Sequence, residues 1–358
     1  MTSITEAEIR AKHSEEVAHL QDKLKEKEQE LKEYKKEHGI LEYFFRQVRS
    51  QVEPISPLPK EYKPTKKSRV EKNIPAVAHS TDGHHGMEQK ASEIEGFNAF
   101  SPEISEARQL GFTKEFIEWV DLHRHNYIID EMTHIVTGDM ISGDIHDDLR
   151  RTNTWPAPVQ AVEAGKLLAK QVALEAPHFR QVTVEFIVAD NHSRLTKKPQ
   201  AKEAGLNSLN YVVGEVAKAY LRDHTNVFFN LYPMHETVIH VANRQYLICH
   251  GHDVRGWAGV PWYGIERKVG KESMARLQII MQDLNKSKTI GFHKYVFGHW
   301  HVPIDLPLYQ ATGSVSGTDA YDHQNGRYSE PTQSAWMVHP EYGEFDRTNF
   351  KLARYDNL

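Results

Sequence analysis

The chain has 358 residues, of which 39% are apolar and 26% charged, and its formal net charge of −5 excludes a general attraction for nucleic acid. Its single cysteine, Cys249, excludes an internal disulfide, and no apolar run approaches the roughly 18 residues of a membrane span. Because the N-terminus also lacks the apolar core of a signal peptide, we expect a cytoplasmic protein that makes no membrane contact.

Residues 1–50 have the spacing of a coiled-coil helix. They are rich in Glu and Lys and contain no proline. With Val17 at heptad position a, the a and d positions over four heptads are aliphatic or aromatic except at Lys27 and His38. We expect this helix to form a homodimer or a higher oligomer; the alternative is a solvated helix that lies on its own domain. The seam comprises Val17, Leu20, Leu24, Lys27, Leu31, Tyr34, His38, Leu41, Phe45 and Val48.

Residues 51–73 separate this helix from the rest of the chain. The stretch 52–73, VEPISPLPKEYKPTKKSRVEKN, has four prolines that alternate with lysines and lacks a periodic apolar pattern. Such a composition predicts an extended linker. Its positive charge could contact an anionic partner, although a plain solvated tether is the simpler interpretation. The remaining residues, 74–358, are expected to form one folded domain.

From Ile74 onward, short apolar runs alternate with amphipathic segments, as in an α/β domain. Strands are predicted at 74–80, 132–137, 182–189, 245–249 and 294–297, and helices at about 101–128, 157–175, 202–222 and 271–286. The runs at 226–232, 236–242 and 245–250 lack intervening helices, which predicts an antiparallel meander. The tail after Pro307 is expected to be rich in strands, with runs at 334–339 and 343–352.

Each of the five predicted strands ends in a polar cluster, at the edge where α/β sheets place their sites. One pair of histidines spaced by two, as in His299 and His301, is weak evidence by itself. Five strand-end clusters of Asp, Asn and His together indicate a metal site. The clusters are Asp82-Gly83-His84, Gly138-Asp139, Asp190-Asn191-His192, His250-Gly251-His252 and Gly298-His299-Trp300-His301.

This set of side chains suits two divalent cations about 4 Å apart, bridged by one carboxylate. Asp and His ligands favour Mn²⁺, our first expectation, and also fit Fe, Zn²⁺ and Mg²⁺, whereas the lack of thiolate ligands argues against a structural zinc site. A neutral Asn carbonyl leaves the site positively charged, which suits an anionic phosphate. A bound water then loses a proton near neutral pH and attacks phosphorus in line.

The order D-x-H, GD, NH, H and GHxH over about residues 74–340 resembles the calcineurin-like metallophosphoesterase superfamily. The resemblance implies that residues 74–358 are the catalytic domain, a four-layer α/β/β/α sandwich of two mixed sheets flanked by helices. It implies that His192 binds no metal but orients the phosphate and, as general acid, protonates the leaving oxygen. The implied ligands are Asp82, His84 and His301 for the first metal, Asn191, His250 and His299 for the second, and Asp139 as the bridge.

A closer likeness is to metallophosphoesterases of phages and prophages, some of which resemble Mre11-type nucleases. The segments FSPEISEAR, GDMISGDIHDDL, NHSRLTKKPQAK and VPWYGIER carry it. If the chain is phage-encoded, its place is the host cytoplasm. The third motif departs from the superfamily, because Asp190 stands where glycine is usual and Ser193 where an acidic residue is usual. His85 is a second candidate ligand beside His84, and whether Asp190 or His85 alters the metal site stays open.

Candidate substrate-binding residues follow the third and fourth clusters. Arg194, Lys197 and Lys198 could form a basic lip that holds a phosphate or a nucleic-acid backbone; the alternative is a solvated loop leading into a helix. His252 could face the phosphate. The aromatic residues Trp257, Trp262 and Tyr263, with Arg267, could stack a base or simply pack on the core.

Three functions remain after these observations. The first is a two-metal phosphodiesterase that acts as a nuclease on DNA. The second is a phosphomonoesterase, or a nucleotide or cyclic-nucleotide phosphodiesterase, with a small substrate. The third is a coiled-coil scaffold protein with an inactive metal site. The intact ligand set favours an enzyme over the scaffold.

Overall fold

The computed structural model describes residues 23, 25, 45–46, 48–62, 72–256 and 259–356, which fall into two compact units, Met1–Val52 and Glu53–Leu358. In the first unit, residues 45–46 and 48–51 are helical, and the amide of Val52 donates to the carbonyl of Val48 (3.1 Å). Most of the predicted coiled coil, residues 1–50, lies outside the described residues, so the coiled coil and its oligomer remain predictions.

Residues 53–62 form no helix or strand, as expected of an extended segment. Backbone hydrogen bonds nevertheless tie them to the helical part of the second unit, to which they belong. The amide of Ile55 donates to the carbonyl of Tyr220 (3.0 Å), and the amides of Glu61 and Tyr62 donate to that of Pro177 (3.0 and 2.9 Å). This half of the predicted tether is therefore bound to the fold and is not free in solvent. The stretch 63–71 lies outside the described residues.

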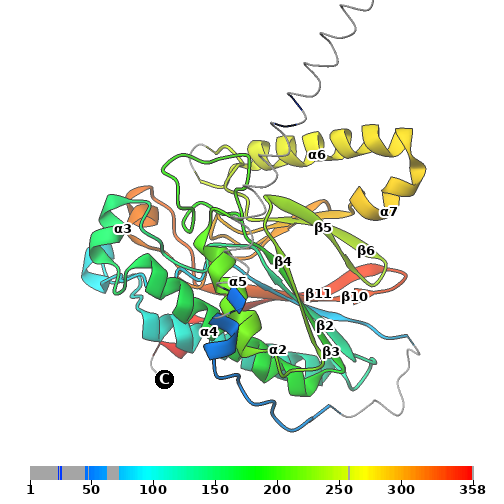
Figure 1. Ribbon diagram of the computed structural model, residues 1–358, viewed down its shortest axis with the longest axis horizontal. Helices are drawn as coiled ribbons and strands as arrows, with labels where there is room; N and C mark the ends of the chain where they lie inside the picture. Colours follow the sequence, from blue (N-terminus) through cyan, green and yellow to red (C-terminus); the bar gives the residue numbers. More distant parts are fainter. Residues whose placement is uncertain are drawn as a thin grey trace, which may run out of the picture. The chain divides into compact units, whose positions relative to one another are not determined.

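The first of two sheets has six strands in the order β11-β10-β1-β2-β3-β4 (Figure 1). Strands β1 to β4 are parallel neighbours, whereas β10 pairs antiparallel with both β1 and β11. Every residue of β1 is buried, as expected for a strand whose sheet is covered on both faces. The strands are β1 (Ala76–Ser80), β2 (Glu131–Val136), β3 (Gln181–Ile187), β4 (Val227–Tyr232), β10 (Thr332–His339) and β11 (Gly343–Lys351).

The second sheet has five strands in the order β5-β6-β7-β9-β8. Strands β6, β7 and β9 are parallel, and the edge strands β5 and β8 run antiparallel to their neighbours. Both sheets are therefore mixed. The strands are β5 (Glu236–Val241), β6 (Arg244–Cys249), β7 (Lys294–Phe297), β8 (Ile304–Asp305) and β9 (Tyr309–Ala311).

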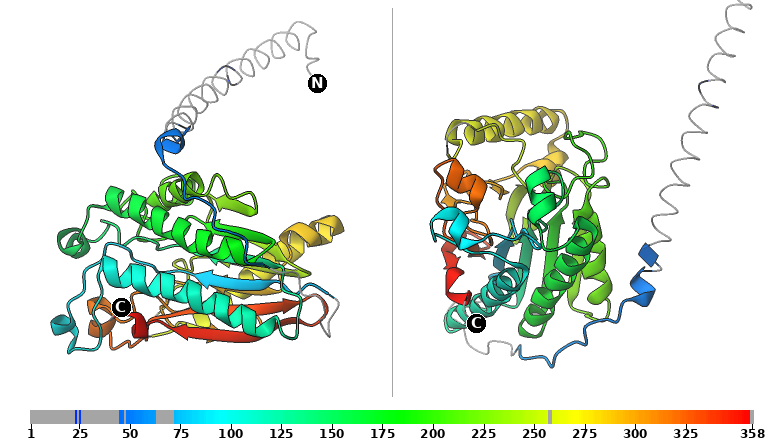
Figure 2. Two further views of the ribbon diagram at one scale, coloured as in Figure 1. Left: turned by 90° about the horizontal axis from the view of Figure 1, so that it is seen from below. Right: turned by 90° about the vertical axis from the view of Figure 1, so that its left-hand side faces the viewer.

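Helices cover the outer face of each sheet, which makes four layers (Figures 1 and 2). On the first sheet lie α2 (Pro102–His123), α4 (Ala157–Glu175) and α5 (Leu209–Tyr220), for example with Val213 in one core cluster with Val184. On the second lies α6 (Trp262–Gln282), with Ile265 in a cluster with Leu247. A third apolar cluster, which includes Trp336, lies between the sheets. The predicted four-layer α/β/β/α sandwich is thus confirmed.

Shorter helical segments lie in the connections between these elements. They are η1 (Ala91–Ile94), α3 (Asp147–Thr152), η2 (Ala176–His178), η3 (Leu284–Lys286), α7 (Ser287–Ile290), α8 (Ala320–Gln324) and η4 (Ala353–Tyr355), where η denotes a 3₁₀ helix. Of these, α3 and α8 follow strands that lead toward the polar clusters.

Two predicted helix starts are wrong, and the helix expected at about 101–128 already ends at His123. The helix expected at 202–222 begins only at Leu209, because the hydroxyl of Ser208 accepts a hydrogen bond from the amide of Asn210 (3.1 Å) and caps it. The helix expected at 271–286 already begins at Trp262 and contains Gly264. A side chain at Gly264 would place its Cβ 2.3 Å from the carbonyl oxygen of Arg255, so close packing explains this glycine.

The predicted antiparallel meander over 226–250 is also wrong in part. Strands β5 and β6 do form an antiparallel pair. Strand β4, however, joins the first sheet, where it runs parallel to β3. Helix α5 connects β3 to β4 as a crossover, so the apolar run at 226–232 completes one sheet before the chain passes to the other.

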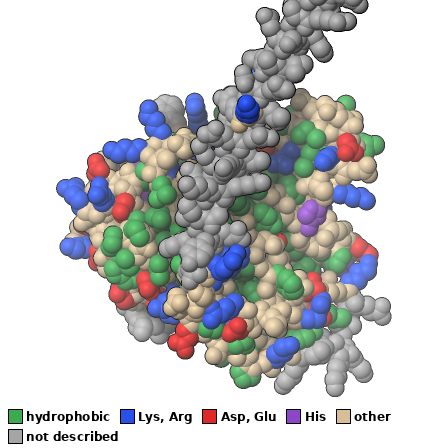
Figure 3. All heavy atoms as spheres, in the orientation of Figure 1, with side chains coloured by type: hydrophobic (Ala, Val, Ile, Leu, Met, Phe, Trp, Pro, Cys, Tyr) green, Lys and Arg blue, Asp and Glu red, His purple; other side chains and the backbone are tan. Residues whose placement is uncertain are grey.

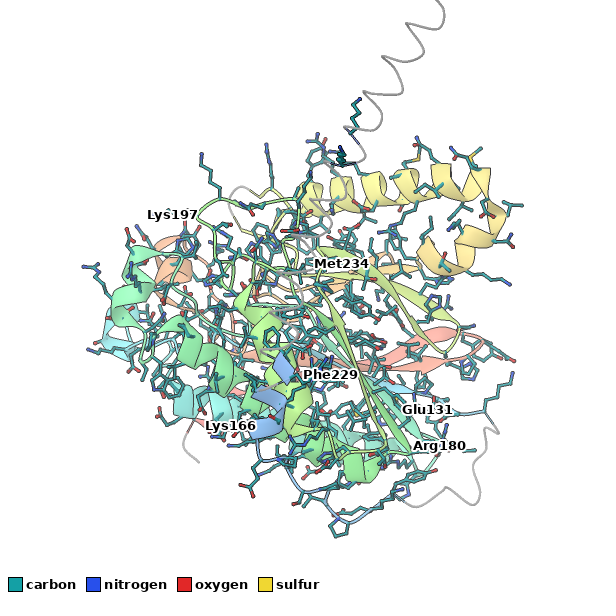
Figure 4. The ribbon with its side chains drawn as sticks, in the orientation of Figure 1. Glu131, Lys166, Arg180, Lys197, Phe229 and Met234 are labelled. Carbon is teal, nitrogen blue, oxygen red and sulfur yellow. The ribbon has the colours of Figure 1, made fainter. Side chains whose placement is uncertain are left out.

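The topology brings the ends of distant strands to one edge of the molecule. Strands β1, β2 and β3 are parallel, so their carboxyl ends share an edge. In Figure 4, Lys197 on the loop after β3 lies at the upper left, whereas Glu131 and Arg180, at the amino ends of β2 and β3, lie at the lower right. The polar clusters predicted from the sequence therefore converge at the end marked by Lys197.

The packing between the sheets predicts a large loss of stability on truncation of Trp336. This side chain is 0% exposed, and its indole N–H donates to the hydroxyl of Tyr246 (3.4 Å). Trp336→Ala is expected to lower the free energy of unfolding by about 3–5 kcal/mol, measured by urea titration. The control Tyr342→Ala, at a position 80% exposed, should change it by less than about 0.5 kcal/mol. Equal losses in the two variants would contradict the packed inter-sheet core.

Candidate metal centre

The loops after five strands carry the predicted ligands. Three loops follow β1, β2 and β3 of the first sheet, and two follow β6 and β7 of the second. In the order of the strands, these loops carry Asp82 and His84, then Asp139, Asn191, His250, and finally His299 with His301.

Left-handed backbone recurs at these loops. The φ angle is 50° at Asp82, 40° at His84, 46° at Asp139, 69° at His299 and 56° at His301. Residues with a Cβ rarely adopt such angles, and each instance costs about 1–3 kcal/mol. Among the described residues, five of the nine non-glycine positions with positive φ are predicted metal ligands. Such clustering is typical of functional sites, where the surrounding fold holds side chains in a strained arrangement.

The first group of ligand atoms comprises Asp82, His84 and His301. The Nε2 atoms of the two histidines are 3.3 Å apart, and Asp82 Oδ1 lies 3.5 Å from that of His301 and 3.9 Å from that of His84. Asp82 Oδ1 is buried and has no hydrogen-bond partner within the described chain. A buried carboxylate oxygen without a donor, facing two imidazole nitrogens, is the donor set that a divalent cation requires.

The second group comprises Asp139, His250 and His299, with Asn191 beside it. His250 Nε2 lies 2.9 Å from both Asp139 Oδ2 and Asn191 Oδ1, and the rings of His250 and His299 are 5.1 Å apart. Asp139 also belongs to a third group with His84 and His192. Asp139 is therefore the carboxylate that shares ligand groups with both His84 and His250.

Without a cation, the cluster keeps Asp139 ionised and His84 neutral, which are the states that bind cations, but it keeps His250 protonated. Burial lowers the pKa of His84 to about 3, and the neighbouring His192 acts in the same direction. Burial alone would raise the pKa of Asp139, but the rings of His250 and His192 hold it well below its usual range. Against the effect of burial, Asp139 raises the pKa of His250 to about 10. A cation held by the same atoms displaces that proton, so metal binding here releases protons.

His192 lies at the edge of this cluster. Its Nδ1 donates to the carbonyl of Ser142 (2.8 Å), its backbone amide donates to Asp139 Oδ1 (3.1 Å), and its ring lies 4.6 Å from that of His84. Because a carbonyl can only accept, Nδ1 carries the hydrogen and Nε2 is left for another partner. Gly143 allows this approach, since a Cβ there would lie 2.0 Å from the His192 carbonyl oxygen.

Asp190 has a structural role in the site. Its Oδ2 accepts from the amide of Asp139 (2.7 Å) and from the side chain of Asn210, and its Oδ1 accepts from the amide and hydroxyl of Ser193 (2.9 and 2.5 Å). Burial raises its pKa to about 7, and the charge of Asp139 acts in the same direction. Asp190 belongs to none of the three ligand groups. It ties the second and third loops together, and Ser193 is its partner.

His85 points away from the ligand groups. Its Nδ1 lies 3.1 Å from the hydroxyl of Ser105, and its ring lies 5.5 Å from that of Trp155. Of the two histidines in the first loop, only His84 shares a group with Asp82 and Asp139.

The predicted substrate-binding residues occupy different positions. Arg194 donates to the carbonyls of Asn191 (2.7 Å) and Thr196 (3.0 Å), so its guanidinium braces its own loop. Lys197 and Lys198 are exposed and pair with no carboxylate in the described chain. The ring of His252 lies 5.6 Å from that of His250 and lines a hollow with Arg194.

The aromatic residues after the fourth cluster do not form part of the ligand groups. Trp262 and Tyr263 lie in the first turn of α6 and are 50% and 77% exposed, so neither packs in the core. Trp257 lies outside the described residues.

Gly298 and Trp300 shape the last loop. A Cβ at Gly298 would lie 2.2 Å from the Thr81 hydroxyl and 2.6 Å from Asp82 Oδ2, so this glycine permits close approach to the first loop. The left-handed backbone angles of this loop are at His299 and His301 and not at Gly298. Trp300 packs against the outer cluster of the second sheet, and its ring lies 5.1 Å from that of His299.

Asp322 in α8 belongs to the site, although no sequence signal pointed to it. Its Oδ2 accepts from His301 Nδ1 (3.0 Å), which directs Nε2 of that ring toward Asp82. Carboxylates behind metal-binding histidines set the orientation of the ring and raise its basicity. The sequence offered no spacing from which to find it, because Asp322 lies 21 residues after His301, in a short helix that follows no cluster of predicted ligands.

Asp322→Asn is expected to weaken binding of the first metal about 10- to 100-fold while the fold is retained. The loss follows because the neutral amide orients the His301 ring less strongly than a carboxylate does. Isothermal titration with Mn²⁺ measures it. Asp223→Asn, which alters an exposed carboxylate in the turn after α5 and outside every ligand group, is the control and should bind Mn²⁺ as the unchanged chain does. Unaltered affinity in Asp322→Asn would show that His301 needs no such support.

Fold and side chains together define a four-layer α/β/β/α sandwich with a candidate dinuclear metal centre at the carboxyl ends of its strands. No protein-family model and no curated protein sequence matches the chain. Solved structures with a similar fold include the Zn²⁺ complex of Vps29 from Entamoeba histolytica (13% identity, 77% of this chain and 99% of that one, TM-score 0.26). Others are Vps29 from Cryptosporidium parvum (11%, 78% and 100%, 0.31) and a predicted phosphoesterase from Streptococcus pneumoniae (11%, 78% and 99%, 0.27).

At such identities and TM-scores, these likenesses say nothing about the site or the activity of this chain. In the part of the chain that the structure describes, no helix is both long enough and apolar enough to cross a bilayer.

Proposed function

We propose that this chain is a calcineurin-like metallophosphoesterase that hydrolyses phosphodiester bonds with two divalent cations and acts on DNA. The observation that supports it most is the convergence of Asp and His ligand atoms from both sheets into three overlapping groups that share Asp139 and His84. The unpartnered, buried Oδ1 of Asp82 supports a cation at the first position.

Seven side chains would hold the cations. Asp82, His84 and His301 hold the first, Asn191, His250 and His299 the second, and Asp139 bridges. Bound there, Mn²⁺ or another divalent cation supplies Lewis-acid stabilisation of the phosphoryl oxygens and lowers the pKa of water. The ligands leave the site with excess positive charge, because three carboxylate or amide groups and four neutral imidazoles face two divalent ions. An anionic phosphate compensates that charge.

The chain's own residues complete the reaction. The carbonyl of Ser142 holds the Nδ1–H of His192, which directs Nε2 toward the substrate. His192 Nε2, when protonated, donates to the leaving oxygen and so prevents expulsion of an unstable alkoxide. Asp190 keeps the backbone of Asp139 in position during this step. His252, Lys197 and Lys198 provide positive charge and hydrogen-bond donors beside the scissile phosphate.

A nuclease is favoured over an enzyme for small substrates by the surroundings of the site. Lys197 and Lys198 are exposed and pair with no carboxylate of the described chain. The exposed aromatic residues Trp262 and Tyr263 lie in the first turn of α6. Both features suit a substrate longer than one nucleotide. Kinship with phage and Mre11-type enzymes, self-association through residues 1–50 and a cytoplasmic location are proposals that accompany this one.

An activity screen tests the proposal. The purified chain with Mn²⁺ should hydrolyse bis-p-nitrophenyl phosphate, and EDTA should stop it. Single- and double-stranded DNA, RNA, mononucleotides and cyclic dinucleotides are compared in the same buffer. Degradation of DNA supports the nuclease, and turnover of only the small substrates would assign the second function. No turnover with Mn²⁺, Fe²⁺, Zn²⁺ or Mg²⁺ would leave the scaffold protein.

A further inference from the structure

A second hollow lies between the loop 251–256 and the first half of α6. We call it the α6 hollow. It has a volume of about 400 Å³, and its lining includes four cations and one carboxylate. The charged residues are Asp253, Arg255, Arg267, Lys268 and Lys271, and Tyr263 joins them. None of these residues belongs to the ligand groups of the metal centre.

One of the four cations is already used by the fold. Lys268 pairs with Asp253 (2.7 Å), Glu272 (3.1 Å) and Glu236 (3.2 Å), and so anchors the loop and α6 to β5. This network makes the hollow a fixed feature of the fold. It also neutralises the only carboxylate of the lining, so the remaining charge of the hollow is positive.

Among the described residues, no carboxylate pairs with the other three cations. Arg255, Arg267 and Lys271 are exposed, and none pairs with a carboxylate of the described chain. Tyr263 is 77% exposed beside them, although burial of a tyrosine ring is generally favourable. Unpaired cations next to an exposed aromatic ring are the combination that binds single-stranded nucleic acid, with phosphates on the cations and bases on the ring.

The hollow is close to the reacting centre along the chain. Arg255 lies five residues after His250, which limits the separation of their Cα atoms to about 18 Å. At a rise of about 3.4 Å per nucleotide, that distance corresponds to roughly five nucleotides. On the face drawn in Figure 3, Lys and Arg side chains also gather at the upper left, where Figure 4 places Lys197.

We propose that the α6 hollow binds a single strand of nucleic acid a few nucleotides from the scissile phosphate. Arg255, Arg267 and Lys271 contact its phosphates, and Tyr263 stacks on one unpaired base. The inference rests on the proposed function, because it gives that enzyme a strand for a substrate in place of a mononucleotide. A duplex offers no free base face to Tyr263, so single strands are preferred.

The test measures binding without turnover. A fluorescein-labelled 15-nucleotide oligothymidylate is titrated by anisotropy, in EDTA, with the full chain and with the triple variant Arg255→Gln, Arg267→Gln and Lys271→Gln. We expect the triple variant to lose at least about tenfold in affinity, and the slope of log K against log salt to fall by about 2. Tyr263→Leu should lose roughly fivefold or more. A duplex of the same length should bind more weakly than the single strand.

A matched control separates local contacts from net charge. Lys114→Gln with Lys286→Gln and Lys288→Gln removes the same charge from exposed positions on α2, η3 and α7, and should keep the affinity within about twofold. Equal losses in the two triple variants would overturn the inference, as would unchanged binding in the first. Because EDTA prevents hydrolysis, the result is independent of the activity screen. If the chain has no phosphoesterase activity but its variants show these losses of affinity, the inference about the α6 hollow stands and only the proposed reaction is wrong.

Discussion

Asp139→Asn is expected to abolish most phosphodiesterase activity, by about three orders of magnitude, and to remove bound metal at the same time. Asp139 is the one carboxylate that shares a ligand group with both halves of the cluster, with His250 and His299 on one side and with His84 on the other. Its low pKa shows that the fold keeps it ionised. The amide has no charge and one fewer acceptor oxygen, so neither cation is held with its former affinity. Metal content after dialysis and the rate on bis-p-nitrophenyl phosphate measure the two losses.

Asp148→Asn is the matched control for this substitution. Asp148 is an exposed carboxylate on α3, nine residues further along the same connection, and belongs to no ligand group. It should retain both metal and rate. If Asp139→Asn kept two bound cations and normal turnover, the bridge, and with it the dinuclear assignment, would be wrong.

His192→Gln is expected to lose about 10²- to 10⁴-fold in rate while both metals stay bound. The backbone amide of His192 donates to Asp139, and its ring packs on the ring of His84. The ring Nδ1 donates to the carbonyl of Ser142. Removal of the ring therefore removes a proton donor and leaves the seven proposed ligands in place. The loss should be smaller on bis-p-nitrophenyl phosphate than on a dinucleotide, because p-nitrophenolate leaves without protonation and a ribose or deoxyribose oxygen does not.

This dependence on the leaving group distinguishes a proton donor from a metal ligand. A ligand would lose metal, and its loss of rate would be equal on both substrates. His125→Gln, at an exposed position in the turn after α2 and outside every ligand group, is the control and should behave as the unchanged chain. Retained activity of His192→Gln on the dinucleotide would remove His192 from the mechanism.

The strands that carry the site were predictable because their signal is local. Runs such as AVAHS and KYVF are short, apolar and followed by polar clusters, and both are buried strands in the structure. Helix starts were less predictable, since they depend on capping and packing. Ser208 caps α5 through its own hydroxyl. In α6, Gly264 leaves room for the carbonyl of Arg255, which a residue with a Cβ would not. The place of β4 could not be read from its sequence, because an apolar run pairs equally well in either sheet.

The candidate ligands were predictable for a different reason. Each closely follows a strand, so the local pattern of a strand and a polar cluster identifies it whatever the tertiary structure. Residues that support the ligands from other elements carry no such mark. Asp322 behind His301 and Ser142 behind His192 act through single hydrogen bonds that only the folded chain brings together. The role of Asp190 is similar, because its partners Asp139 and Asn210 come from two other segments.

The amino-acid sequence by itself determined the layered α/β class and the five strand-end clusters, since both depend on local periodicity and on the residues next to each strand. A family resemblance implied how the ligands divide, and the tertiary structure shows their placement: Asp139 shares groups with both halves of the cluster, whereas His85 lies against Ser105. It also brought Arg255, Arg267 and Lys271 to one hollow with Tyr263. These are distances between segments far apart in the chain, and they are set by the pairing of strands and the packing of two sheets, which no local pattern encodes.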